Sequence, residues 1–151
     1  MRRNRRLALG AALLLAGIAA AAGAAPPKKL AREAIPAGFA IGSGQPSLEL
    51  EVKVEGGAVV SSAPASGGQG SLRAVRSGGE DDGQTMLTIS GSLDVAVKFD
   101  LYVSRDGRTF EYASSCAVTP GISSFEMWRY PVREFAFGNV RAMPAGRMSC
   151  D

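Results

Sequence analysis

Tryptophan, tyrosine and arginine are concentrated in one short stretch near the C-terminus. Residues 125–135 read FEMWRYPVREF and hold the single Trp of the chain. These three residue types are the ones most enriched at protein-binding hot spots, and the proline within the stretch restricts the backbone there. The sequence therefore predicts a candidate binding patch formed by Trp128, Arg129, Tyr130 and Arg133.

The same aromatic side chains have a second interpretation, as part of a hydrophobic core. A domain of this size needs large side chains in its interior, and aromatic residues bury the most area each. In that case the core contains Phe125, Trp128, Phe135 and Phe137, and the two arginines lie in water. Both interpretations hold together if Trp128 is half buried.

The composition excludes most enzyme chemistries. The chain has no histidine, which rules out Ser-His-Asp and Cys-His nucleophiles, His-ligated zinc and acid–base catalysis by imidazole. It also lacks the glycine-rich phosphate-binding motifs. We therefore expect a protein that is not an enzyme, with no catalytic residue, no bound metal and no cofactor.

Carboxylates are the remaining route to catalysis. Asp100 and Glu111 are expected on neighbouring strands with both side chains on the solvent-facing side, where carboxylates are usually only solvated. The acidic run EDDG at 80–83 lacks the alternating spacing of a calcium loop. These acids support only an alternative function, a carboxylate- or metal-dependent hydrolase acting on envelope polysaccharide.

The N-terminus has the three-part form of a secretory signal peptide. Four Arg precede an apolar run over residues 7–22, and small residues follow it. We expect residues 1–24 to form a cleaved signal helix, of the Sec type rather than the twin-arginine type. The run is shorter than the ~20 residues that span a bilayer, so no membrane insertion is expected after cleavage.

Export changes the meaning of the net charge. The whole chain has 17 basic and 14 acidic residues. Residues 1–24 contain four of the basic residues and no acidic residue. The mature chain then has 13 basic and 14 acidic residues, a net charge of −1. Attraction to nucleic acid through overall charge is therefore not expected.

Cys116 and Cys150 are the only cysteines. In an oxidising compartment an even pair without CxxC spacing indicates a structural disulfide. We expect these two residues to be bonded, so that the C-terminal tail is fixed to the body of the domain.

Short strands dominate the first part of the mature chain. Residues 25–46 form a Pro- and Gly-containing segment with room for two helical turns near 30–35. Strict alternation over 47–55 predicts a half-buried strand, and 58–63 a weaker one. The Gly-rich residues 64–84 are predicted to be a flexible loop, or a short edge strand between two loops.

A hairpin is predicted farther along the chain. Asp106-Gly107 favours a two-residue type I′ turn, which places Val103 opposite Phe110. The alternating run before it, 87–103, fits either one strand bent at a glycine or a second hairpin that turns at 90–92.

The next two segments carry the aromatic stretch. Residues 124–129 fit one helical turn or, alternatively, a strand that puts Trp128, Tyr130 and Val132 on one face. Residues 132–143 are predicted to form a strand.

The strand pattern predicts an all-β fold, a small antiparallel β-sandwich or partly open β-barrel, as a single domain over 47–151. We expect a non-catalytic bacterial domain, periplasmic or secreted, that binds a protein or an envelope component, for example as an inhibitor or immunity-type partner. The alternatives are the hydrolase named above and a passive structural or assembly protein of the cell envelope.

Overall fold

The structure is a computed structural model that describes residues 28–35, 39–42, 44–79, 81–113, 116–144, 147 and 150. The predicted signal peptide, residues 1–24, lies outside the described residues. Within these ranges no helix is long and apolar enough to cross a membrane. The elements are β1 (Lys29–Ala31), the 3-10 helix η1 (Arg32–Ala34), β2 (Ala40–Gly42), β3 (Ser47–Glu55), β4 (Ala58–Pro64), β5 (Leu72–Gly79), β6 (Gln84–Gly91), β7 (Val97–Ser104), β8 (Thr109–Ala113), β9 (Ser124–Trp128) and β10 (Glu134–Ala142).

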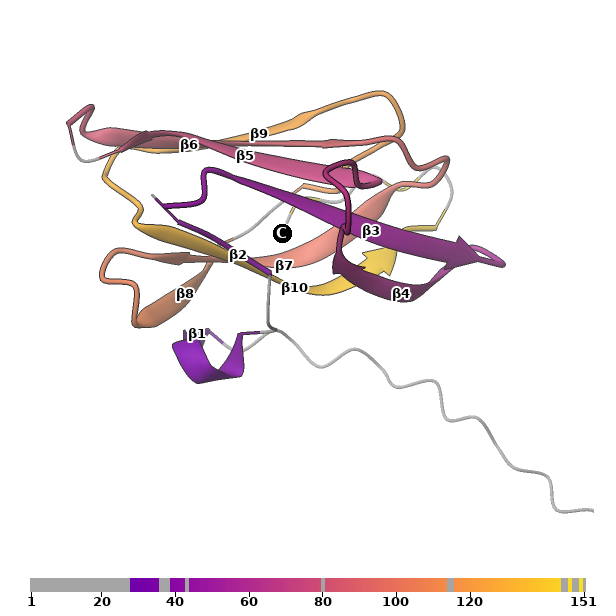
Figure 1. The fold of residues 1–151 in the computed structure, drawn as a ribbon, viewed down its shortest axis with the longest axis horizontal. Coiled ribbons are helices and arrows are strands. Elements are labelled where there is room, and N and C mark those ends of the chain that lie inside the picture. Colours follow the sequence, from indigo (N-terminus) through magenta and orange to yellow (C-terminus); the bar gives the residue numbers. More distant parts are fainter. Residues whose placement is uncertain are drawn as a thin grey trace, which may run out of the picture.

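These strands form two antiparallel sheets that pack face to face (Figure 1). Sheet A has the order β1-β8-β7-β10-β2, and sheet B has the order β4-β3-β5-β6-β9. Each sheet has five strands, and neither closes into a barrel. The predicted all-β antiparallel sandwich is confirmed.

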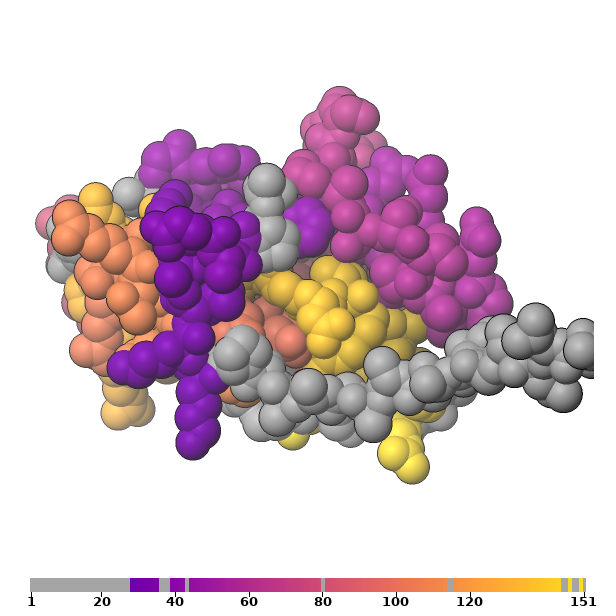
Figure 2. Space-filling view, turned by 90° about the horizontal axis from the view of Figure 1, so that it is seen from below, coloured from indigo at the N-terminus to yellow at the C-terminus, as the bar shows by residue number. Residues whose placement is uncertain are grey.

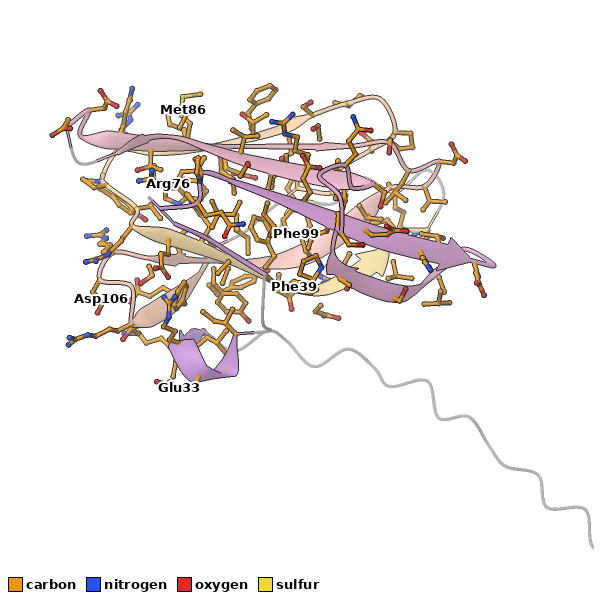
Figure 3. All side chains as sticks on the ribbon, in the orientation of Figure 1. Glu33, Phe39, Arg76, Met86, Phe99 and Asp106 are labelled. Atoms are coloured by element: carbon orange, nitrogen blue, oxygen red, sulfur yellow. A yellow bond between two sulfur atoms is a disulfide. The ribbon has the colours of Figure 1, made fainter. Side chains whose placement is uncertain are left out.

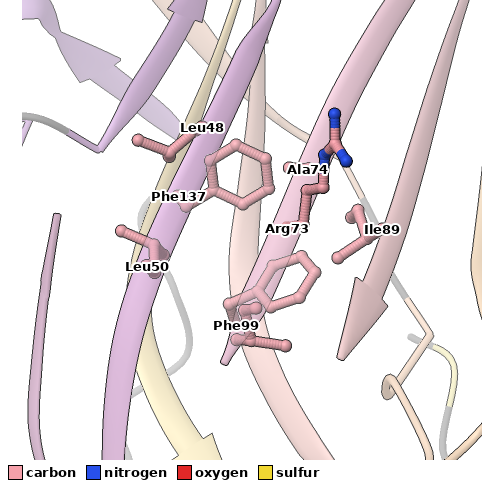
Figure 4. A pocket seen from close by; sticks show the side chains of 8 residues that line it. Leu48, Leu50, Arg73, Ala74, Ile89, Phe99 and Phe137 are labelled. Atoms are coloured by element: carbon pink, nitrogen blue, oxygen red, sulfur yellow. The ribbon is translucent and has the colours of Figure 1, made fainter. Parts of the chain in front are cut away.

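The main core lies between the two sheets. The alternation predicted for β3 is confirmed, because Leu48, Leu50 and Val52 are buried. Phe99 and Phe137 meet edge to face at the centre, with ring centroids 5.3 Å apart (Figure 4). The gap beside these rings measures about 10 Å³, about the space of one water molecule, so it is too small for a ligand.

Strand β7 is buried on both faces, which the sequence did not indicate. All eight of its residues are buried. Its odd-numbered residues enter the main core, while Tyr102 joins Phe110 and Ala136 in a second, smaller cluster on the other face. Leu30 and Ile35 of the N-terminal segment pack against that cluster, and Figure 2 shows this segment, in indigo, over the orange β8.

The hairpin of β7 and β8 forms, but its predicted register was wrong by one residue. Tyr102 pairs with Tyr112, and Val103 with Glu111 rather than with Phe110. The prediction assumed one buried face for the hairpin. Because the N-terminal segment buries the second face, Phe110 can turn to that side, and a one-residue shift moves every side chain to the opposite face.

Two further predictions in the middle of the chain need correction. Of the two alternatives for 64–84, the flexible loop was wrong; a strand forms, as β5, but it lies inside sheet B between β3 and β6 and not at an edge. Pairing on both edges stabilises this strand although only Leu72 and Ala74 are buried. The run 87–103 is neither a bent strand nor a hairpin, because β6 and β7 belong to different sheets.

The remaining segments follow the predictions in part. Strands β4 and β10 are confirmed, and the disulfide between Cys116 and Cys150 is present. Of the two alternatives for 124–129, the helical turn was wrong. A strand forms, as β9, but it ends at Trp128, so Tyr130 and Val132 lie outside it. Near 30–35 the chain forms one short 3-10 helix instead of two helical turns.

Candidate functional site

The four residues predicted to form the binding patch lie where the chain crosses from sheet B to sheet A. Trp128 ends β9 and is half buried, with its ring 5.0 Å from that of Phe135. Tyr130 is half buried as well, whereas Arg129 and Arg133 are exposed. The two sequence interpretations therefore hold together, with aromatic side chains against the core and arginines in solvent.

The connector between β9 and β10, residues 129–133, is held by buried hydrogen bonds. The backbone N–H of Val132 donates to the hydroxyl of Thr85 at 2.9 Å, and that hydroxyl donates to the carbonyl of Tyr130 at 3.4 Å. The guanidinium of Arg76 donates to the Val132 carbonyl at 3.0 and 3.3 Å. Thr85 and Val132 are fully buried, so these hydrogen bonds fix the connector on its side that faces the protein interior.

Thr85→Val is expected to destabilise the domain by about 1–3 kcal/mol, because it leaves the buried N–H of Val132 without an acceptor. Thr88→Val is the matched control, since Thr88 is half buried on the outer face of the same strand. Chemical denaturation measures both variants. Equal unfolding free energies for the two would show that the hydroxyl of Thr85 does not anchor the connector.

The loop between β7 and β8, residues 105–108, packs beside the connector. The guanidinium of Arg105 lies 3.8 Å above the ring centroid of Tyr130, a favourable cation–π arrangement. The backbone N–H of Arg133 donates to the carbonyl of Ser104 at 2.8 Å. A β-carbon on Gly107 would lie 3.5 Å from Cδ of Arg133, so the loop and the connector form one continuous surface.

Asp106 organises this loop through backbone hydrogen bonds. Its carboxylate accepts the N–H groups of Thr109 at 2.9 Å and Arg108 at 2.8 Å, and the hydroxyl of Ser104 at 3.1 Å. These bonds, led by the one from Thr109, lower the pKa of Asp106 from 3.8 to about 2. A loop held by these side-chain bonds therefore connects β7 and β8 instead of the predicted two-residue type I′ turn.

The lowered pKa sets a pH dependence for the loop. Because the folded pKa lies below the unfolded value, the carboxylate stabilises the fold fully above about pH 4, and this contribution is lost as the pH falls toward 2. Titration of the Asp106 carboxyl group by NMR should give a midpoint near 2. A midpoint at or above 3.8 would contradict this account of the loop.

The loop and the connector carry four exposed arginines, Arg105, Arg108, Arg129 and Arg133. None of them forms an ion pair with another described residue. The carboxylate of Asp106 is already used by the loop, while Asp81 and Asp82 in the β5–β6 turn are exposed acids at the same end of the sandwich (Figure 1). We call the four arginines and Tyr130 the arginine surface.

The candidate carboxylate pair does not come together. Glu111 pairs with Val103, whose side chain enters the main core, so Glu111 is on the inner face of sheet A. Asp100 is on the outer face, against the expectation that both share one face, and Arg141 donates to it at 2.8 Å. Glu111 pairs instead with Lys29 at 3.3 Å. No group of three or more potential metal ligands occurs among the described residues.

Sequence reasoning missed an apolar surface next to this site. Phe125, one of the residues predicted for the core, is 68% exposed, and Met127 is 56% exposed. Pairing with β6 turns Glu126 and Trp128 toward the other sheet, so Phe125 and Met127, which alternate with them, face solvent. The strand alternation of SFEMW predicts this surface, but the same residues also fit a helical turn.

Comparisons with known proteins give no relative. No protein-family model matches the chain, and neither a curated protein nor a solved structure matches it. The two packed antiparallel sheets and the bond between Cys116 and Cys150 define the chain as a disulfide-bonded β-sandwich.

Proposed function

We propose that the chain is a non-catalytic, exported bacterial binding domain that uses the arginine surface to hold a partner. The observation that carries this proposal is a set of four exposed arginines that form no ion pair with a described residue. They lie on the loop and the connector on either side of the half-buried Tyr130, and Arg105 contacts its ring. Arginine and tyrosine together are typical of binding hot spots.

The chemistry of this surface favours an acidic partner. Guanidinium groups bind carboxylates through two parallel hydrogen bonds, and such charge-assisted bonds are about twice as strong as neutral ones. The connector is already anchored by Thr85 and Arg76, so binding orders little additional backbone. An acidic face of another exported protein fits best, which includes an inhibitor or immunity-type pairing.

Two further observations support the proposal. The bond between Cys116 and Cys150 fits a protein that works in an oxidising compartment, such as the periplasm or the exterior of the cell. The separation of Asp100 and Glu111 on opposite faces of sheet A removes the pair on which the hydrolase alternative relied.

The test compares two charge-reversed variants of the full chain, expressed with its own N-terminus and used to capture partners from envelope extract. Arg129→Glu/Arg133→Glu is expected to reduce capture at least tenfold, because it places carboxylates against an acidic partner. Lys53→Glu is the matched control, since Lys53 is exposed on β3 and belongs to no ion pair with a described residue. Equal capture by both variants, or no specific capture by the wild type, would refute the proposal.

A further inference from the structure

Exposed hydrophobic side chains gather on one part of sheet B. Four of the five large ones in the described part of the chain lie on β6, on β9 or just before β9; they are Met86 (38% exposed), Ile122 (60%), Phe125 (68%) and Met127 (56%). Met86 pairs directly with Met127, and Figure 3 shows Met86 pointing away from the sandwich. We call Met86, Phe125 and Met127 the β9 patch.

The patch lies on a strand with an open edge. β9 is the last strand of sheet B and pairs only with β6 among the described strands. No backbone hydrogen bond from a described residue reaches its other edge, so in the described part of the chain that edge presents N–H and C=O groups that can pair with another chain. Natural proteins usually blunt such an edge with charged or proline residues on the exposed face, whereas here that face carries Phe125 and Met127.

Glu126 lies between Phe125 and Met127 in the sequence, and its carboxylate is on the opposite face of β9. Glu126 points to the inner face of β9, is half buried, and accepts the backbone N–H of Cys116 at a long 3.4 Å. Burial raises the pKa of Glu126, and the bond from Cys116 lowers it by less. No described residue forms an ion pair with this carboxylate.

We propose that β9 is a docking edge at which an extended segment of a partner protein adds as a further strand of sheet B. Backbone hydrogen bonds supply the pairing, and side-chain alternation supplies the selectivity. The segment has the pattern apolar–basic–apolar. Its basic residue lies opposite Glu126, and its flanking apolar residues meet Phe125 and Met127.

Charge disfavours a second copy of this chain as the occupant. The two-fold antiparallel pairing that places Phe125 against Met127 of the other copy also places Glu126 directly opposite its own equivalent. Like charges opposite each other destabilise a strand pair. A different chain that carries lysine or arginine at that position satisfies the same edge without this penalty.

This docking edge does not depend on the arginine surface. The two sites require opposite charges in their partners, since one presents guanidinium groups and the other a carboxylate. Charge reversal at Arg129 and Arg133 therefore tests the arginine surface, while substitution of Glu126 tests the docking edge, and the failure of one leaves the other standing.

The experiment titrates the full chain with two short synthetic peptides and follows backbone amide shifts by NMR. In one peptide valine alternates with lysine; in the other valine alternates with glutamate. The lysine peptide should shift the amides of β9 and bind at least tenfold more tightly than the glutamate peptide. Glu126→Gln should abolish that difference, while Arg129→Glu should leave the preference for the lysine peptide in place.

Three results would overturn the proposal. The first is the absence of β9 shifts with the lysine peptide up to about 1 mM, a weak affinity worth about 4 kcal/mol. The second is equal binding of the two peptides by the wild type. The third is a β9 shift that depends on protein concentration without peptide, which would assign the edge to a second copy.

Phe125→Ser, at an exposed position, keeps the fold intact and should weaken binding of the lysine peptide.

Discussion

Removal of the disulfide by Cys116→Ser/Cys150→Ser is expected to lower the free energy of unfolding by roughly 3–4 kcal/mol. The bond joins residues 34 positions apart and connects the C-terminus to the segment that follows β8. Without the bond, the unfolded chain gains the conformational freedom of that loop. The loss is a large part of the 5–15 kcal/mol by which domains of this kind are usually stable.

Chemical denaturation of the wild type and the double variant measures this effect. Wild-type protein unfolded in the presence of a reductant should match the double variant, because both lack the same covalent bond. If the double variant and the oxidised wild type differ by less than about 1 kcal/mol, the disulfide is not a major source of stability.

Phe135→Ala is expected to cost about 3–5 kcal/mol, because Phe135 is fully buried and its removal leaves a cavity in the main core. The substitution also removes the ring that packs against Trp128 at 5.0 Å. The emission of the single Trp should therefore shift to longer wavelength as its indole becomes more hydrated. Urea denaturation and fluorescence follow the two effects on one sample.

Phe125→Ala is the matched control for this prediction. It makes the same chemical change at a position that is 68% exposed on β9, where surface substitutions usually change stability by less than about 0.5 kcal/mol. A large loss of stability from Phe125→Ala, with little from Phe135→Ala, would reverse the assignment of core and surface in this region.

The features that depend on local pattern were predictable from the sequence. The strict alternation of SLELEVKVE gives β3 with its burial pattern. A single cysteine pair without CxxC spacing indicates the disulfide, which is present. The pattern of short alternating strands then predicts the antiparallel β-sandwich, which the structure confirms.

The features that depend on distant segments were not predictable. The register of the β7–β8 hairpin follows from the N-terminal segment, which buries Phe110 on the outer face of sheet A. β5 exists because two neighbours pair with it, although its own sequence is poor in apolar residues.

The candidate site, too, was predictable only in part. Aromatic and arginine content identified the connector, and the structure places its arginines in solvent. Arg105 was missed because it comes from a loop distant in the sequence that folds over Tyr130. Phe125 was assigned to the core because hydrophobicity alone does not tell which face of an edge strand is covered.

The most direct test of the central claim places a photo-reactive benzophenone side chain at position 129, 125 or 53 of the full chain in living cells. Position 129 samples the arginine surface, 125 the docking edge and 53 the outer face of β3. The account predicts a discrete cross-linked species of higher mass from position 129 and none from position 53. Cross-links of equal yield from 129 and 53, or none from 129, would contradict a binding function for the arginine surface.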